Sequence, residues 1–221
     1  MKILAINGSP KGSKSQTMIL VQALLNGAKS SGAEVELVDV CKLKLDYCNA
    51  CGVCYEKGKC IHKDDFEGLY RKMLDSDGLV LASPNYFRSV TAQLKTLIDR
   101  MADTIHCQLF EGKYGCALAT AGSPNYAEVT DYLSRIITGF GAYSVGSVGA
   151  APSIPGDMDA KEKAAFKLGE ALVDAIKTKR TFPDQDAIHN ETRKRFKMLV
   201  EMNKDIWAHE YEYWNKKKID K

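Results

Sequence analysis

Residues 2–17 read KILAINGSPKGSKSQT, an apolar run followed by a glycine- and serine-rich turn. The run predicts a buried strand over Lys2–Asn7, and the apolar positions after the turn have helical spacing. Glycines allow a tight turn, and backbone amides at a helix N-terminus can bind a phosphate. The stretch therefore predicts a strand, a turn and a helix. The turn is either an ordinary capped connection or a phosphate-binding loop.

This turn differs from two common nucleotide-binding motifs. It has no G-x-G-x-x-G, and a P-loop needs four residues between its glycines and a lysine directly after the second. Here three residues separate Gly8 from Gly12, and Ser13 precedes Lys14. The sequence therefore lacks the dinucleotide fingerprint and excludes an ATPase.

The alternation of strand and helix patterns continues along the chain. Strands that read as continuous apolar runs and alternate with helices are typical of a parallel sheet covered on both faces. We predict an α/β fold, a flavodoxin-like doubly wound five-stranded parallel sheet in the order 2-1-3-4-5. The predicted strands are Lys2–Asn7, Glu34–Val38, Gly78–Ala82, Tyr114–Thr120 and Tyr143–Val148. The predicted helices are Ser15–Ser30, Asp64–Asp75, Thr91–Ala102, Tyr126–Gly139 and Ala160–Lys177.

Composition excludes several classes of partner. The chain has 221 residues and a formal net charge of +3, and the basic excess lies from Lys179 onward. So small an excess argues against nucleic-acid binding. No apolar run approaches the roughly 20 residues of a membrane span, and the N-terminus lacks the pattern of a signal peptide. We therefore expect a cytoplasmic protein with no membrane or nucleic-acid partner, in which disulfides are the exception.

The predicted connection from Asp39 to Lys63 is unusually long, and loops of this length are usually functional or disordered. It holds four of the seven cysteines in a C-x2-C-x2-C-x5-C pattern, namely Cys48, Cys51, Cys54 and Cys60. Three thiolates at intervals of three residues can bind one face of an iron–sulfur cubane, and the fourth binds the remaining iron. A zinc site with four sulfur ligands and a loop without metal remain alternatives.

Two further connections follow strand ends at the same predicted edge of the sheet. The first contains Pro84, Asn85, Tyr86 and Phe87, and the second contains Thr120, Ala121 and Gly122. A flat aromatic ligand needs backbone amides along its polar edge and aromatic or apolar groups against its faces. The two connections supply both kinds of group, although ordinary turns before helices would also have these residues.

Together these motifs resemble the NADPH-dependent FMN reductase family. Gly8-Ser9-Pro10 leading to Ser15-Gln16-Thr17 is similar to its phosphate loop, and Ser83-Pro84-Asn85-Tyr86-Phe87 is similar to its flavin loop. The resemblance implies that FMN phosphate is bound by Ser9, Lys11, Ser15, Gln16 and Thr17. It also implies that the flavin ring is bound by Pro84, Asn85, Tyr86, Phe87, Thr120, Ala121 and Gly122.

The cysteine spacing resembles the iron–sulfur flavoprotein branch of that family, in which these four positions bind a 4Fe–4S cluster. The implied function is an FMN-dependent oxidoreductase that passes electrons between FMN and the cluster, with no catalytic acid or base from the protein. The implied partners are ferredoxin or NAD(P)H, a small-molecule electron acceptor and further copies of the chain in a homodimer or homotetramer. Two alternatives are an NAD(P)H-dependent FMN or quinone reductase without a cluster, and a non-enzymatic electron carrier or redox sensor.

A linker near Thr181–Asp184 divides the chain into a flavodoxin-like domain, residues 1–180, and a C-terminal helical extension, residues 181–221. The extension is predicted to be one helix over Asp186–Lys217. Its apolar stripe packs on its own domain or, as we slightly favour, on another subunit. From Phe196 onward the stripe consists of Leu199, Val200, Ile206, Trp207, Tyr211 and Trp214. Asp64 and Asp65 are predicted to cap the following helix. The resemblance assigns structural or interfacial roles to Lys95, Asp99 and Arg100.

Overall fold

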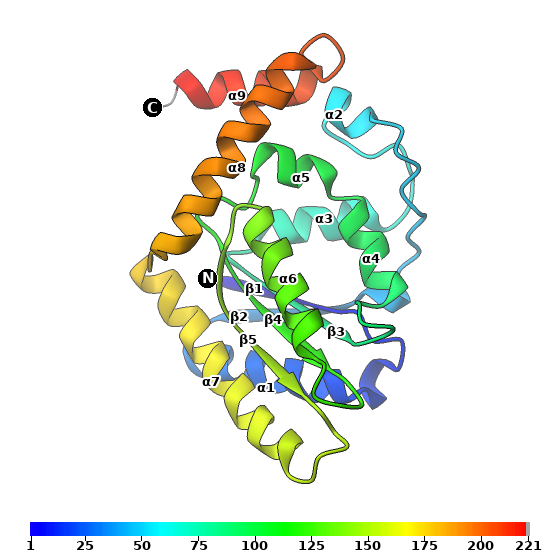
Figure 1. Cartoon of the computed structure of the whole chain (residues 1–221), viewed down its shortest axis with the longest axis vertical. Coiled ribbons are helices and arrows are strands. Elements are labelled where there is room, and N and C mark those ends of the chain that lie inside the picture. Colours follow the sequence, from blue (N-terminus) through cyan, green and yellow to red (C-terminus); the bar gives the residue numbers. More distant parts are fainter. Residues whose placement is uncertain (220–221) are drawn as a thin grey trace.

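The computed structural model describes residues 1–219 and contains a five-stranded parallel sheet (Figure 1). The strand order is β2-β1-β3-β4-β5, which confirms the predicted flavodoxin-like order. All four neighbouring pairs are parallel, so the carboxyl ends of the strands lie at one edge. The strands are β1 (Lys2–Asn7), β2 (Glu34–Asp39), β3 (Gly78–Pro84), β4 (Tyr114–Thr120) and β5 (Tyr143–Ala150).

Helices cover both faces of this sheet. Because side chains alternate along a strand, Leu4 and Ile6 face one core whereas Ile3 and Ala5 face the other. The first core is covered by α3 (Phe66–Asp75), α4 (Ala92–Asp99) and α6 (Ala127–Gly139), and the second by α1 (Gln16–Ser30) and α7 (Asp157–Thr178). No described helix is both long and apolar enough to span a membrane.

Two glycines fix the position of α1, at whose N-terminus the predicted phosphate loop ends. A Cβ atom added at Gly27 would lie 2.0 Å from the carbonyl oxygen of Phe166 on α7, and one added at Gly169 would lie 2.0 Å from that of Leu24. Such distances are far below van der Waals contact, so only glycine allows α1 and α7 to pack this closely.

Two predicted helices are each interrupted. The helix predicted over Thr91–Ala102 ends at Asp99 and resumes as α5 (Ala102–Cys107), because the chain turns at Arg100 and Met101 and buries both side chains. The extension forms α8 (Pro183–Met202) and α9 (Ala208–Ile219). They are separated at Asn203, whose side-chain amide donates to the carbonyl oxygen of Leu199.

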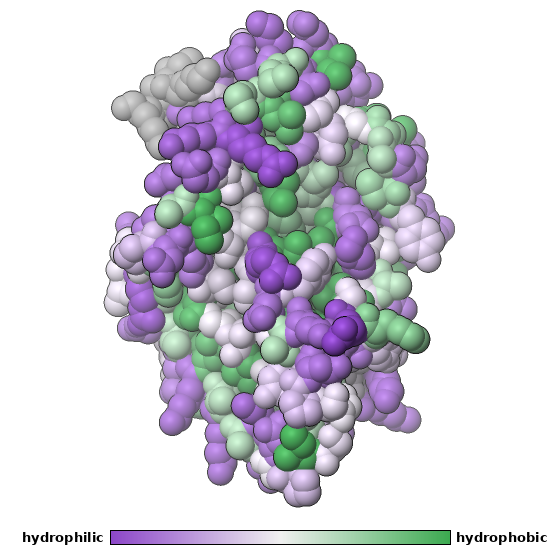
Figure 2. Space-filling view, in the orientation of Figure 1, coloured by the Kyte–Doolittle hydropathy of each residue, from purple (hydrophilic) through white to green (hydrophobic). Residues whose placement is uncertain are grey.

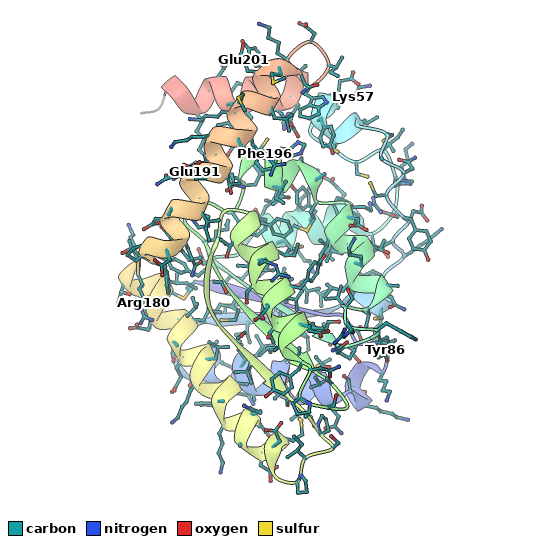
Figure 3. The ribbon with its side chains drawn as sticks, viewed as in Figure 1. Lys57, Tyr86, Arg180, Glu191, Phe196 and Glu201 are labelled. Carbon is teal, nitrogen blue, oxygen red and sulfur yellow. The ribbon has the colours of Figure 1, made fainter. Side chains whose placement is uncertain are left out.

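The extension packs on its own domain. Phe196, Val200 and Trp214 of the predicted apolar stripe are buried, whereas Ile206 is exposed. In Figure 1 α8 and α9 lie at one end of the molecule, beside α5 and α2 (Val53–Lys57), a short helix that the sequence patterns did not indicate. Figure 3 shows Phe196 on the side of α8 that faces α5. The buried part of the stripe is therefore used within the chain.

Candidate functional site

The turn after β1 forms one wall of a cavity at the carboxyl edge of the sheet. Hydrogen bonds within the turn hold it in place: the backbone N–H of Ser9 donates to Asn7 Oδ1 at 3.2 Å, and that of Thr17 donates to Ser15 Oγ at 3.1 Å. The Gly8 N–H donates to the carbonyl oxygen of Ala82 at 2.8 Å. Ser15 thus caps α1 and directs the positive end of its dipole toward the cavity.

The cavity has a volume of about 240 Å3. Eleven of the twelve residues predicted to bind a flavin cofactor line it, and Phe87 does not. Sequence reasoning missed two further lining residues, Lys14 and Pro152. The eleven are Ser9, Lys11, Ser15, Gln16, Thr17, Pro84, Asn85, Tyr86, Thr120, Ala121 and Gly122.

Contacts between the strand-end turns make this cavity a single unit. The hydroxyl groups of Thr17 and Thr120 lie 2.6 Å apart and join the first and fourth turns. The backbone N–H of Asn85 donates to the carbonyl oxygen of Thr120 at 2.7 Å, which joins the third and fourth. Both threonine side chains are buried and uncharged. Hydrogen bonds between the turns therefore fix the shape of the cavity wall.

Phe87 lies outside this cavity. It occupies the tip of the turn between Tyr86 and Ser89, and its side chain is fully exposed. Phe87 and Arg88 both have left-handed backbone conformations, with φ of 50° and 64°. Non-glycine residues rarely adopt this conformation, so the turn holds an aromatic ring in solvent at a cost in backbone energy.

The four cysteines of the long connection line a second, smaller cavity. Cys48 and Cys51 are exposed, and Cys54 and Cys60 are half-buried. The space between them is only about 30 Å3, and within residues 1–219 no three His, Cys, Asp or Glu side chains are grouped as metal ligands. Burial and the nearby carboxylates Asp103 and Glu210 raise the pKa of Cys54 to about 12, so its thiol is protonated at neutral pH.

Arg100 also lines the cysteine cavity, whereas the family resemblance implied only a structural or interfacial role for it. Its Nη2 donates to Cys60 Sγ at 3.2 Å, and its Nη1 donates to the carbonyl oxygen of Asp46 at 3.2 Å and to the Asp64 carboxylate. The guanidinium lies 4.3 Å above the centre of the Phe66 ring. The side chains of Arg100 and Asp64 are both completely shielded from solvent.

Asp64 combines the predicted capping role with this ion pair. Its carboxylate accepts from the backbone N–H groups of Phe66 at 3.1 Å and Asp46 at 2.7 Å. Burial would raise the pKa of Asp64, but the hydrogen bond from Arg100 and the two backbone N–H groups outweigh it and lower the pKa to about 2. Asp65 instead accepts from the backbone N–H of Lys44 at 2.8 Å and caps nothing with its side chain. Asp64 is therefore ionised at any physiological pH.

The comparisons with known proteins identify the family. The profile of the NADPH-dependent FMN reductase family matches residues 1–155. The chain belongs to this family. An iron–sulfur flavoprotein of Archaeoglobus fulgidus is 36% identical over 220 residues, which cover 98% of this chain and 99% of that protein. An iron–sulfur flavoprotein of Methanocaldococcus jannaschii is 32% identical over 190 residues, 80% of this chain and 98% of that protein.

Solved structures of other proteins share the fold of this FMN reductase family protein. A flavone reductase has a TM-score of 0.66 and 21% identity, over 80% of this chain and 63% of that one. An NAD(P)H:quinone oxidoreductase from Methanothermobacter marburgensis has a TM-score of 0.62 and 16% identity, over 78% and 96% of the two chains. Family membership makes this chain a flavin-dependent oxidoreductase that uses FMN.

Both cavities have donors suited to the cofactors of this family and its iron–sulfur branch. The flavin-side cavity presents a helix N-terminus, hydroxyl groups and two lysines, which together suit an anionic phosphate. The cysteine cavity has four thiols and two buried nitrogen atoms without a hydrogen-bond partner, Arg100 Nε and His62 Nε2. Buried N–H donors are normally satisfied, and cluster sulfur atoms are acceptors that would satisfy them.

A cluster of aromatic side chains joins the segment that holds the four cysteines (residues 43–63, the cysteine segment) to the C-terminal extension. The Tyr55 ring lies 4.8 Å from the rings of both His106 and Trp207, and His106 Nδ1 lies 3.0 Å from the buried Glu210 carboxylate. Gly58 packs directly against His209. Helix α9 therefore supports the segment that carries Cys54 and Cys60.

Proposed function

We propose that FMN binds in the cavity at the N-terminus of α1. Ser9, Lys11, Ser15, Gln16 and Thr17 would bind its phosphate, as the capped helix and the two exposed lysines favour. The flavin ring would lie against the third and fourth turns. There the candidates are Pro84, Asn85, Tyr86, Thr120, Ala121 and Gly122, with Phe87 at the exposed rim.

We further propose that Cys48, Cys51, Cys54 and Cys60 bind a 4Fe–4S cluster and that the protein is an electron-transfer flavoprotein. The observation that carries this proposal is that all four cysteines line one cavity together with unpartnered N–H donors. FMN exchanges one or two electrons and a cluster exchanges one, so the pair would convert hydride or two-electron chemistry into single-electron transfer. The protein's part is to hold the two centres and exclude water.

The two cavities share no lining residue. Figure 3 shows Lys57 of the cysteine segment and Tyr86 of the flavin loop on the same side of the molecule, separated along its long axis. We propose that a homodimer or homotetramer brings the cluster of one copy to the flavin of another. The exposed Tyr47, Ile61, Tyr86 and Phe87 would serve as contacts. Figure 2 shows hydrophobic groups scattered among hydrophilic ones on the face in this view.

An anaerobic absorption spectrum of purified protein, with iron, sulfide, zinc and flavin assays on the same sample, tests the proposal. We expect flavin bands over broad absorbance near 400 nm, with about four irons and one FMN per chain. Zinc in place of iron would assign the cysteines to a structural metal. Flavin with neither iron nor sulfide after anaerobic reconstitution would overturn the cluster proposal.

A second candidate is an NAD(P)H-dependent FMN or quinone reductase whose cysteine segment binds no cluster. The two exposed thiols, Cys48 and Cys51, and the small space of about 30 Å3 between the four cysteines favour it. Rapid NAD(P)H oxidation by cluster-free protein, with quinone or free FMN as acceptor, would support this candidate. Slow NAD(P)H oxidation together with rapid electron exchange with a ferredoxin would instead support the electron-transfer flavoprotein.

A further inference from the structure

Arg100 is the buried cation closest to the cysteine segment, and only 3% of its surface is exposed. A buried charge is costly unless it is paired and hydrogen-bonded. Asp64 supplies the charge, the carbonyl of Asp46 accepts one hydrogen bond, and the Phe66 ring covers one face of the guanidinium. These three partners fix the guanidinium independently of any cysteine.

One nitrogen of the guanidinium contacts a cysteine, and a second nitrogen has no partner. Nη2 donates to Cys60 Sγ at 3.2 Å, and Nε has no partner although it is buried. An ion pair that served only to hold α3 and α4 together would not place one of its nitrogens on a thiol. The arrangement is therefore that of a preset donor group beside a sulfur ligand.

We propose that Arg100 is a positioning residue of the cluster site, which orients Cys60 and raises the reduction potential of the cluster. This inference rests on the proposed 4Fe–4S site. Reduction adds negative charge, and hydrogen bonds to ligand sulfur atoms and a nearby fixed positive charge stabilise the reduced form. Arg100 acts through Cys60 and does not itself bind iron.

The opposite charges of Arg100 and Asp64 allow an electrostatic role to be separated from a structural one. Arg100→Gln removes the positive charge and is expected to lower the midpoint potential of the cluster. Asp64→Asn removes the negative charge and leaves Arg100 in place, so it is expected to raise that potential. A purely structural ion pair would be broken by either substitution, and both variants would then shift in the same direction.

The experiment is an anaerobic redox titration of the reconstituted holoprotein, with the cluster followed by EPR and FMN by absorbance. The FMN potential and stoichiometry report whether each variant is folded. Lys95→Gln, which breaks an exposed ion pair on α4 just before Arg100, is the matched control and is expected to shift neither potential. Arg100→Gln is expected to lose its iron at a chelator concentration about tenfold or more lower, because removing a group that supports a metal ligand typically lowers metal affinity by that much.

Arg100→Lys keeps the charge but not the planar set of N–H donors of the guanidinium. The midpoint potential of its cluster is therefore expected to lie between those of the wild type and Arg100→Gln. Should Arg100→Gln fail to fold, Arg100→Lys and Asp64→Asn carry the same test. An unchanged cluster potential in Arg100→Gln, or shifts of the same sign in Arg100→Gln and Asp64→Asn, would overturn the inference alone. A wild-type protein that takes up no cluster would overturn the proposed site and this inference together.

Discussion

The flavin-side cavity and the cysteine cavity are built on different principles. The first lies where three strand ends meet, and its turns are joined by hydrogen bonds between uncharged groups such as Thr17 and Thr120. The second lies on a segment between β2 and α3 that contains no strand, and it is framed by buried charges, notably Arg100 and Asp64. The first site is held at the edge of the sheet by uncharged hydrogen bonds, and the second is held outside the sheet by a buried ion pair.

This difference indicates how each site responds to its ligand. The flavin-side cavity already has its volume and its capped helix. The cysteine cavity is small and two of its thiols are exposed, so ligand binding must gather them. Substitutions at one site are accordingly expected to leave the other intact.

Replacing a cysteine of the segment should have the largest effect. Cys54→Ala is expected to abolish 4Fe–4S binding and to retain one FMN per chain, because the flavin-side cavity shares no residue with Cys54. Iron, sulfide and flavin assays after anaerobic reconstitution measure both. Cys41→Ser, outside the C-x2-C-x2-C-x5-C pattern, is the control and should keep its iron. Parallel loss of FMN in Cys54→Ala would show that the two sites are coupled.

Thr17→Val should affect the other site. It removes a hydroxyl at the N-terminus of α1 and leaves that of Thr120 without its partner. Losing a hydrogen bond to a charged phosphate costs about 1.5–3 kcal/mol, which corresponds to FMN binding weaker by roughly 10- to 100-fold. Fluorescence titration of the apoprotein with FMN measures this, and Ser30→Ala at the opposite end of α1 should bind normally. Unchanged FMN affinity in Thr17→Val would place the phosphate elsewhere.

A buried carboxyl group makes the cysteine end sensitive to pH. Burial raises the pKa of Asp103 to about 6, although the Tyr70 hydroxyl and the Thr104 N–H donate to it. A raised folded-state pKa means that its stabilising contribution is complete below about pH 4 and is lost as the pH rises through about 6. Asn cannot ionise. The unfolding free energy of Asp103→Asn relative to that of the wild type should therefore rise by about 2 kcal/mol from pH 4.5 to pH 7.5.

Urea unfolding of the cluster-free protein at both pH values measures this gain. Asp131→Asn, at an exposed position on α6, is the control and should show a much smaller change. An equal free-energy difference for Asp103→Asn at the two pH values would mean that Asp103 titrates normally in the folded protein.

The contact between the cysteine segment and α9 gives the smallest effect. Gly58 has φ of 68°, and a Cβ there would lie 2.4 Å from the His209 ring. Gly58→Ala is expected to cost about 1–2 kcal/mol of stability through backbone strain and overlap with His209. Adding His209→Ala should restore the stability lost through the overlap but not the stability lost through backbone strain. Thermal unfolding of both variants measures the two contributions. No recovery in the double variant would mean that the extension does not constrain this segment.

Much of the fold could be predicted because the apolar runs of a doubly wound sheet are continuous. The strand order and the meeting of the β1, β3 and β4 turns follow from parallel strands, which all end at the same edge. The ion pair of Arg100 could not be predicted from local patterns, because its partner Asp64 lies 36 residues away in sequence.

One local signal did point to Arg100. It follows Leu97 by three residues and Leu94 by six, so it continues the buried face of α4. A charged residue on a buried helical face calls for a partner. The extension is similar: its apolar stripe predicted burial, but the contacts of Tyr55 with His106 and Trp207 depend on tertiary packing that spacing alone does not encode.

Every strand of the sheet, and every helix that covers its two faces, lies outside the cysteine segment, residues 43–63. The order of maturation follows from this separation. On the proposed function, the polypeptide could form its sheet and helices and take up flavin before any iron is available, and cluster assembly would be the last step. Cells grown in air should therefore accumulate a yellow, iron-free protein that accepts its cluster after purification without being unfolded.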